Sequence, residues 1–336
     1  MHTLLADEGV GNLVLSIPVG PLMAQRDKAD HIVPALATAA KPVVLVLTGD
    51  ASPIEPFFSD AIRASGVPLF RSGERALRAL RNVAQYSAAL QRAPRGVAAT
   101  GAAAPLPGAV PPNGIFAEYL GKRWLQTLGV PVPRGGLAQD VEAALRIAQG
   151  IGYPVVLKAQ ASELPHKSDA GGVLVNLRDD TALRAGWARL HANVSTHCPG
   201  LQLDGVLVEA MGEPGLELVL GAKRDAAWGP VLLVGLGGIW IEVLKDVRLL
   251  AADLTEADIV VELQQLKAAP LLAGVRGSAA VDVAAIARVV ALVAAQMRAN
   301  PSIREIDINP LVARPDGVLA LDALLVVDHT SAEVPA

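Results

Sequence analysis

The sequence predicts an α/β region followed by an α+β region, and three observations support this organisation. In residues 1–91, short apolar runs alternate with helical patterns, which is typical of a parallel sheet covered by helices. Residues 92–113 are rich in Pro, Ala and Gly and keep no apolar period, as expected of a linker. Residues 114–330 contain further strands and helices, which we assign to an α+β domain with mixed or antiparallel sheets.

The composition excludes several classes of protein. The 336 residues suffice for about two domains. A net charge of −4 without a local Lys/Arg cluster excludes a nucleic-acid partner, and the single cysteine excludes a disulfide framework and a Cys-based zinc site. The apolar stretches 229–243 and 281–297 both contain charged residues, and the N-terminus lacks the pattern of a secretory signal. We therefore expect a soluble cytoplasmic protein with no membrane partner.

Residues 1–91 are predicted to hold three strands. After a helix at 4–8, the apolar runs at 12–17, 43–47 and 66–70 predict buried strands, and Ser72 is expected to cap a helix with Leu77 and Leu80 on one face. Open sheets usually have about four to six strands, so three are few. We infer that this region is part of a domain completed by another chain or by residues missing here. A small self-sufficient domain is the alternative.

The second region is expected to begin with a helix over 115–128 that is capped by Asn113. An extended segment at 130–133 and a helix capped by Asp140 follow. Strands are predicted at 155–158, 173–177, 205–210, 217–221 and 231–234. Helices near 255–268 and 282–298 lead to a segment at 306–312 and then to a last strand at 319–327.

The loop at 163–172 is the most informative segment for chemistry. It joins two predicted strands and contains His166, Lys167 and the pair Gly171-Gly172. Glycines let the backbone approach a phosphate closely, and Lys158 at the end of the preceding strand is well placed to neutralise its charge. An ordinary polar hairpin loop is the alternative.

A second candidate site is the segment 305–311 together with Asp322. Strand alternation places Glu305, Asp307 and Asn309 on one face, and Pro310 is expected to stop the strand. Oxygen ligands of this kind suit Mg²⁺, which usually takes substrate phosphates and waters as further ligands. A hairpin would present Asn309 and Asp322 to one ion. A polar strand face exposed to solvent is the alternative.

Six motifs follow one another along residues 113–328. They are Glu118 to Lys122 before 129–133 (GVPVP), 152–158 (GYPVVLK), 166–169 (HKSD) with 171–173 (GGV), 229–230 (GP) with 235–238 (GLGG), 276–277 (RG) with Asp282, and 305–311 (EIDINPL). In this order they resemble the ATP-grasp subunit of the NDP-forming acyl-CoA synthetases, which include the ADP-forming acetate–CoA ligases and are related to succinyl-CoA synthetase. The resemblance implies an ATP-grasp domain of two subdomains. Residues 1–91 resemble part of the flavodoxin-like ligase domain that precedes it in fused members.

The resemblance also implies roles for individual residues. The implied catalytic residues are His166, Lys158 and Arg276; the implied nucleotide-binding residues are Lys122, Lys158, Gly171, Gly172, Glu209, Met211 and Glu217; and the implied Mg²⁺ ligands are Asn309 and Asp322. Among them, Lys122 and Lys158 would contact the ATP phosphates, residues 209–211 would receive adenine through backbone groups, and Glu217 would bind the ribose. His166 would relay a phosphoryl group, a role that suits a nucleophilic imidazole that is largely neutral at pH 7.

The function implied by the resemblance is the nucleotide half of an acid–CoA ligase. The overall reaction would convert a carboxylic acid, coenzyme A and ATP into acyl-CoA, ADP and phosphate, with Mg²⁺ as cofactor. The family's CoA-binding domain is absent from this sequence, so we expect a CoA-binding, alpha-type subunit or domain as partner, and an oligomer. A non-catalytic or regulatory nucleotide-binding module, or a fragment that is inactive without its partner, are the alternatives.

Overall fold

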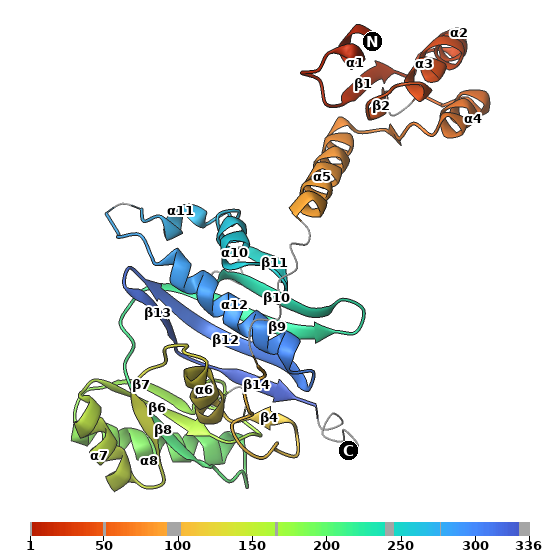
Figure 1. Ribbon diagram of the computed structural model, residues 1–336. Helices are drawn as coiled ribbons and strands as arrows, with labels where there is room; N and C mark the ends of the chain where they lie inside the picture. The colour runs from red at the N-terminus through yellow and green to blue at the C-terminus, as the bar shows by residue number, and fades with distance from the viewer. Residues whose placement is uncertain are drawn as a thin grey trace. The chain divides into compact units, whose positions relative to one another are not determined.

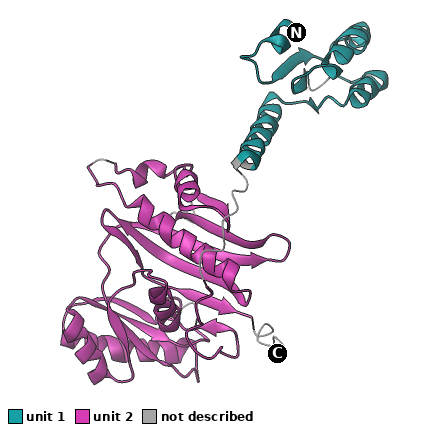
Figure 2. Ribbon diagram, viewed as in Figure 1, with its two compact units in different colours: residues 1–96 teal, residues 97–336 magenta. Residues whose placement is uncertain are grey.

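A computed structural model of the chain describes residues 2–49, 52–92, 102–164, 167–238, 245–275 and 277–328. The chain divides into two compact units, residues 1–96 and 97–336 (Figure 2). Within the described ranges, no helix has both the length and the apolar character needed to cross a membrane.

The first unit contains the predicted three-stranded parallel sheet, in the order β1 (Leu13–Pro18), β2 (Val43–Thr48) and β3 (Leu69–Phe70). One face of the sheet packs on short helices, the first of which corresponds to the helix expected at 4–8, and the other face packs on α5 (Gly73–Arg92). The Ser72 hydroxyl accepts a hydrogen bond from the Arg75 N–H at 3.4 Å, as expected of the predicted cap. The other helical segments are α1 (His2–Ala6), α2 (Leu22–Asp27), the π-helical turn η1 (Lys28–Ile32), α3 (Val33–Ala37) and α4 (Pro56–Ser65).

The second unit contains two sheets, and the larger is largely antiparallel. Its strand order in the described chain is β11-β10-β9-β12-β14-β4, with β13 also paired to β12. The strands are β4 (Ile115–Phe116), β9 (Leu216–Asp225), β10 (Gly229–Leu236), β11 (Val247–Ala251), β12 (Ile303–Arg314), β13 (Gly317–Ala320) and β14 (Leu324–Val327). Helix α12 (Val283–Ala299) lies across β9, β10 and β12 (Figure 1), and α10 (Glu256–Leu263) packs beside it; the short α11 (Ala269–Leu272) follows α10.

The smaller sheet has the order β5-β8-β6-β7 and is antiparallel between all neighbours. Its strands are β5 (Gly135–Ala138), β6 (Val155–Gln160), β7 (Val173–Leu177) and β8 (Gly205–Ala210). The helices α7 (Val141–Ile151) and α8 (Asp180–His197) share a hydrophobic core with it. The predicted cap at the start of α7 is confirmed, because the Asp140 carboxylate accepts from the Ala143 N–H at 2.7 Å.

The predicted start of the second region is wrong. Asn113 caps no helix; its Oδ1 accepts from the Ile115 N–H at 3.0 Å, and Ile115 and Phe116 form β4, which pairs with β14. Helix α6 (Glu118–Thr127) begins only after Ala117. The reason is tertiary, because a β-branched and an aromatic residue find strand partners far along the chain.

Two predictions near the C-terminus are also wrong. Strand β12 does not stop at Pro310 but continues to Arg314, because the register with β9 shifts between Ile308 and Leu311 and this irregularity accommodates a residue without an N–H. The last strand, predicted at 319–327, is two strands, β13 and β14. Asp322 lies in the gap between them.

Candidate functional site

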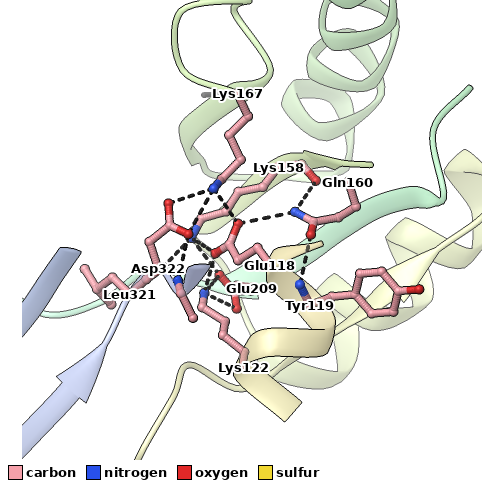
Figure 3. Close-up of polar contacts among 10 residues, drawn as sticks. Glu118, Tyr119, Lys122, Lys158, Gln160, Lys167, Glu209, Leu321 and Asp322 are labelled. Atoms are coloured by element: carbon pink, nitrogen blue, oxygen red, sulfur yellow. Dashed lines mark hydrogen bonds and ion pairs between the residues drawn. The ribbon is translucent and has the colours of Figure 1, made fainter. Parts of the chain in front are cut away.

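Three lysines and three carboxylates form a lysine–carboxylate cluster in the second unit (Figure 3). Its members are Lys122, Lys158, Lys167, Glu118, Glu209 and Asp322. They come from α6, from β6 and β8 of the smaller sheet, from the loop after β6, and from the gap between β13 and β14. All except Asp322 are buried, with 3–8% of each residue exposed. The cluster therefore joins parts of the chain that are far apart in the sequence.

Local geometry explains why these side chains converge. Glu118 and Lys122 are four residues apart in α6, so they share one face of the helix. In the smaller sheet, Glu209 of β8 lies opposite Val156 of β6. Because Lys158 is two residues beyond Val156, its side chain emerges on the same face of the sheet as that of Glu209.

Glu118 is the centre of the cluster. Its Oε1 lies 2.8 Å from the ammonium of Lys122 and 2.7 Å from that of Lys158, and its Oε2 lies 3.0 Å from that of Lys167. Glu209 completes the inner part, at 2.7 Å from Lys122 and 3.1 Å from Lys158. Every carboxylate oxygen of these two glutamates thus faces an ammonium group.

For Glu118 and Lys158 the pairing outweighs the cost of burying the charge, whereas for Lys122 it does not. Burial raises the pKa of Glu118, but Lys158, Lys122 and Lys167 together hold it well below its ordinary value. Burial lowers the pKa of Lys158, but Glu118, Glu209 and Asp322 raise it above its ordinary value. Burial and the charge of Lys158 lower the pKa of Lys122, against the opposing effect of the two glutamates.

Two cavities meet at the cluster. The larger, of about 510 Å³, is lined by apolar side chains such as Val156 and Leu321 and by Lys158, Glu209, Met211 and Glu217, among others. The smaller, of about 300 Å³, is lined by as many polar as apolar residues. Four residues line both cavities: Lys167, Ser168, Asn309 and Asp322. A substrate with an apolar part and an anionic part would fit the larger cavity with its anionic end at this junction.

The structure brings most of the predicted site residues together, but only some of them line a cavity. Met211 and Glu217 line the larger cavity, whereas Lys122 lines neither cavity and is enclosed by Glu118 and Glu209. Gly171 and Gly172 donate their N–H groups to Ser168 and Lys167 within the loop, so these donors are already used. His166 and Arg276 lie outside the described residues.

The segment 209–211 has its backbone donors occupied as well. The N–H of Ala210 donates to the Arg134 carbonyl at 2.8 Å, and that of Met211 donates to the Pro154 carbonyl at 3.2 Å. Its predicted role in receiving a base therefore depends on carbonyl groups and on the Met211 side chain, which is 41% exposed.

The sequence motifs include Glu118 without indicating a role for it, and they do not include Gln160. Gln160 donates to Glu118 at 3.3 Å and accepts from the Tyr119 N–H at 2.9 Å, so it fixes the start of α6 beside β6. A signal for Glu118 is present in the sequence, because Glu118 and Lys122 fall on the same helical stripe as the buried Leu125. A charged pair on an apolar stripe indicates that the pair is buried.

The oxygen-rich side of the junction fits a divalent cation. Asn309 and Asp322 both line it, and Asp307 lies in the smaller cavity beside them. In the described part of the chain, no three His, Cys, Asp or Glu side chains are grouped so that they could hold a metal ion. An ion here would need ligands from a substrate and from water, which is the usual situation for Mg²⁺.

Comparison with known proteins agrees with this geometry. A family described as "ATP-grasp domain" matches residues 112–327. The chain is 42% identical to a trans-feruloyl-CoA synthase from an unknown prokaryotic organism, over 98% of this chain and 46% of the relative. It is 38% identical to subunit beta of the ADP-forming acetate–CoA ligase I of Pyrococcus furiosus, over 64% of this chain and 93% of the relative. The chain thus spans about half the length of the first of these relatives.

A solved structure supports the same relationship. An acetyl-coenzyme A synthetase of Ca. Korarchaeum cryptofilum, in complex with coenzyme A and Ca-AMPCP, matches with a TM-score of 0.62 and 35% identity, over 64% of this chain and 94% of that chain. Another structure of that synthetase contains Mg-AMPPCP, and its phosphohistidine segment points towards the nucleotide site; it matches with a TM-score of 0.56 and 33% identity, over 64% of this chain and 93% of that chain.

The carboxyl of Asp307 makes the site pH-dependent. Burial, with the negative charges of Glu305 and Asp322, raises the pKa of Asp307 to about 6. A carboxyl pKa that is higher in the folded than in the unfolded chain stabilises the fold fully below about pH 4, and this stabilisation is lost as the pH rises through about 6. We expect Asp307→Asn to become more stable than the wild-type chain as the pH rises from 4 to 7, by about 1–3 kcal/mol.

Thermal unfolding in metal-free buffer measures this difference. Tryptophan fluorescence reports on the second unit alone, because all 4 tryptophans lie beyond residue 96. The exposed Asp253→Asn in the same unit is the control and should show no such trend. A stability gap between Asp307→Asn and wild type that does not change between pH 4 and 7 would contradict the raised pKa.

Proposed function

Because the chain belongs to the ATP-grasp domain family, and within it to the ADP-forming acyl-CoA ligases, we propose that it performs the MgATP-dependent phosphoryl transfer of an acid–CoA ligase. The complete reaction converts a carboxylic acid, coenzyme A and ATP into acyl-CoA, ADP and phosphate, or runs in reverse. The observation that carries the proposal is the lysine–carboxylate cluster at the junction of the two cavities.

The larger cavity is proposed as the nucleotide site. Its apolar side chains suit the faces of a purine ring, and the carboxylate of Glu217 suits the ribose hydroxyls. Lys158 would bind the phosphates, since it lines this cavity while Glu118 and Glu209 fix its position. Lys122 would then act indirectly: it would hold Glu118 and Glu209 in place, and these two glutamates position Lys158.

Asn309 and Asp322 would hold Mg²⁺ together with phosphate oxygens and waters. When bound, the ion would neutralise charge on the transferring phosphoryl group. Lys158 in the larger cavity and Lys167 at the junction supply positive charge from the protein. This arrangement keeps donors and charges fixed before the nucleotide arrives.

The smaller cavity is proposed as the acceptor side of the transfer. His166 directly precedes Lys167 in the loop between β6 and β7, although it lies outside the described residues. A neutral imidazole nitrogen would attack the γ-phosphorus, the bond from phosphorus to the leaving ADP oxygen would break, and the phosphoryl group would pass on from the imidazole. Arg276 is retained as a proposed catalytic residue on the family resemblance alone.

The remaining chemistry is assigned to a CoA-binding partner, either a subunit or a domain. Supporting this, the Pyrococcus relative is named as a subunit beta, and the relatives that match the whole chain are about twice as long. A cytoplasmic location and an oligomeric assembly belong to the same proposal. The relatives are named after ferulate and acetate, and we propose that the carboxylic acid substrate resembles one of these two acids.

The first test is nucleotide binding by the full chain. Lys158→Met should weaken the binding of MgADP about tenfold or more, because the lost contact is a charge-assisted hydrogen bond to phosphate. Lys223→Met is the matched control, since it removes a lysine whose side chain is 77% exposed. Isothermal titration calorimetry measures both affinities, and tryptophan fluorescence verifies that each variant is folded. Binding of MgADP by Lys158→Met with wild-type affinity would refute the assigned role, and no binding by the wild-type chain would refute the proposed function.

The second test concerns His166. Incubation of the chain with γ-labelled ATP and the candidate CoA-binding partner should leave an acid-labile, base-stable label on this chain, as a phosphohistidine does. His166→Asn should abolish the label and leave MgADP binding within about twofold of wild type, because the imidazole is not assigned to nucleotide binding. His191→Asn in α8 is the control, and its label should persist. Persistence of the label in His166→Asn would exclude the relay.

A further inference from the structure

The ion pair between Lys167 and Asp322 is the feature that the proposed function leaves unexplained. The ammonium of Lys167 lies 2.9 Å from Oδ1 and 2.7 Å from Oδ2 of Asp322, so it contacts both oxygens of the proposed metal ligand. Oδ1 also accepts from the Ala323 N–H at 2.8 Å. The ammonium thus lies between the two carboxylate oxygens, and a cation that binds Asp322 through both of them has to displace it.

The lysine is the group that can leave. The Ala323 N–H is part of the backbone beside Asp322, whereas an ammonium on a four-carbon stem is a mobile point charge. Lys167 also contacts Glu118 at 3.0 Å, so its ammonium keeps one partner when it releases Asp322. Its main chain stays in place, because the Lys167 carbonyl accepts from the Gly172 N–H at 2.7 Å.

The location of the ion pair explains how a nucleotide could drive this exchange of partners. Lys167 and Asp322 both line the larger and the smaller cavity, so the ion pair stands where the two cavities meet. A metal–nucleotide would bring a cation for Asp322 and phosphate anions for the lysine to this same place. The charges of the cluster are balanced before it binds, with three ammonium groups against three carboxylates.

We propose that Lys167 occupies the position of the divalent cation at Asp322 while the nucleotide cavity is empty, and that it transfers to the phosphates when the nucleotide brings the metal. The inference rests on the proposed function, because it takes Asp322 as the metal ligand. Lys167 then prevents a metal ion from binding without nucleotide. It also keeps the carboxylate of Asp322 neutralised until that ion arrives.

The test measures the binding of Mn²⁺ alone to the full chain without nucleotide. The electron paramagnetic resonance signal of the free ion reports how much Mn²⁺ remains unbound. Lys167→Met should bind Mn²⁺ about tenfold or more tightly than the wild-type chain, because Asp322 loses its competing ammonium. The double variant Lys167→Met/Asp322→Asn should lose the gain. Lys223→Met is the matched control, since Lys223 also lies beside a carboxylate of β12, that of Glu305 at 4.0 Å, and its removal should produce no gain.

A second measurement tests whether Lys167 neutralises Asp322 before a metal ion arrives. In the presence of EDTA, Lys167→Met should bind ADP about tenfold more weakly than wild type, because the phosphates then approach a carboxylate that has lost its ammonium partner. Lys167→Gln repeats both measurements if the methionine variant does not fold, since its amide can still donate to Asp322 or Glu118. It should show the same two changes in direction.

Any of three results would overturn the inference. The first is Mn²⁺ binding that is equal in the folded Lys167 variant and the wild type. The second is a gain in Mn²⁺ binding that survives Asp322→Asn. The third is ADP binding in EDTA that is unaffected by the loss of the ammonium. These failures are distinguishable from failure of the proposed function, because that function is refuted only if the wild-type chain does not bind MgADP.

Discussion

Six charged groups meet in the interior of the second unit, and the need to pair them constrains the rest of its structure. A buried charge without a partner costs several kcal/mol, and removal of one member of a buried pair typically costs about 3–5 kcal/mol. Glu118 meets this constraint by contacting three lysines at once. It can do so only if α6, the smaller sheet and the segment before β14 keep their mutual positions, so the cluster fixes the junction of the two cavities.

The same pairing organises the chemistry. A phosphate site needs positive charge that is already in place, because rearrangement during the reaction adds to the barrier. Lys158 is held by Glu118, by Glu209 and by the Leu321 carbonyl, so its ammonium has little freedom. Lys167 differs, because Asp322, one of its two partners, is 33% exposed in its side chain and lies at the edge of the cavities. The site thus combines a fixed lysine with one that can exchange partners.

The parts of this fold that were predictable are those with local signals. The caps at Ser72 and Asp140 and the apolar strands β6, β7 and β8 follow from neighbouring residues, and the structure contains all of them. The parts that were not predictable depend on distant partners. Ile115 and Phe116 form a strand only because β14 lies beside them, and the continuation of β12 past Pro310 depends on its register with β9. Glu118 belongs to this second class, because its partners Lys158 and Lys167 are 40 or more residues away.

We infer that the junction of the two cavities is a phosphate site built before the nucleotide arrives. A crystal structure of the full chain with Mg²⁺ and a non-hydrolysable ATP analogue would test this inference. We expect the base in the larger cavity, phosphate oxygens within hydrogen-bonding distance of Lys158, the metal ion on Asp322, and Glu118 and Glu209 still bound to Lys122. A nucleotide bound elsewhere, or one whose phosphates contact neither Lys158 nor Lys167, would exclude a preformed phosphate site at this junction.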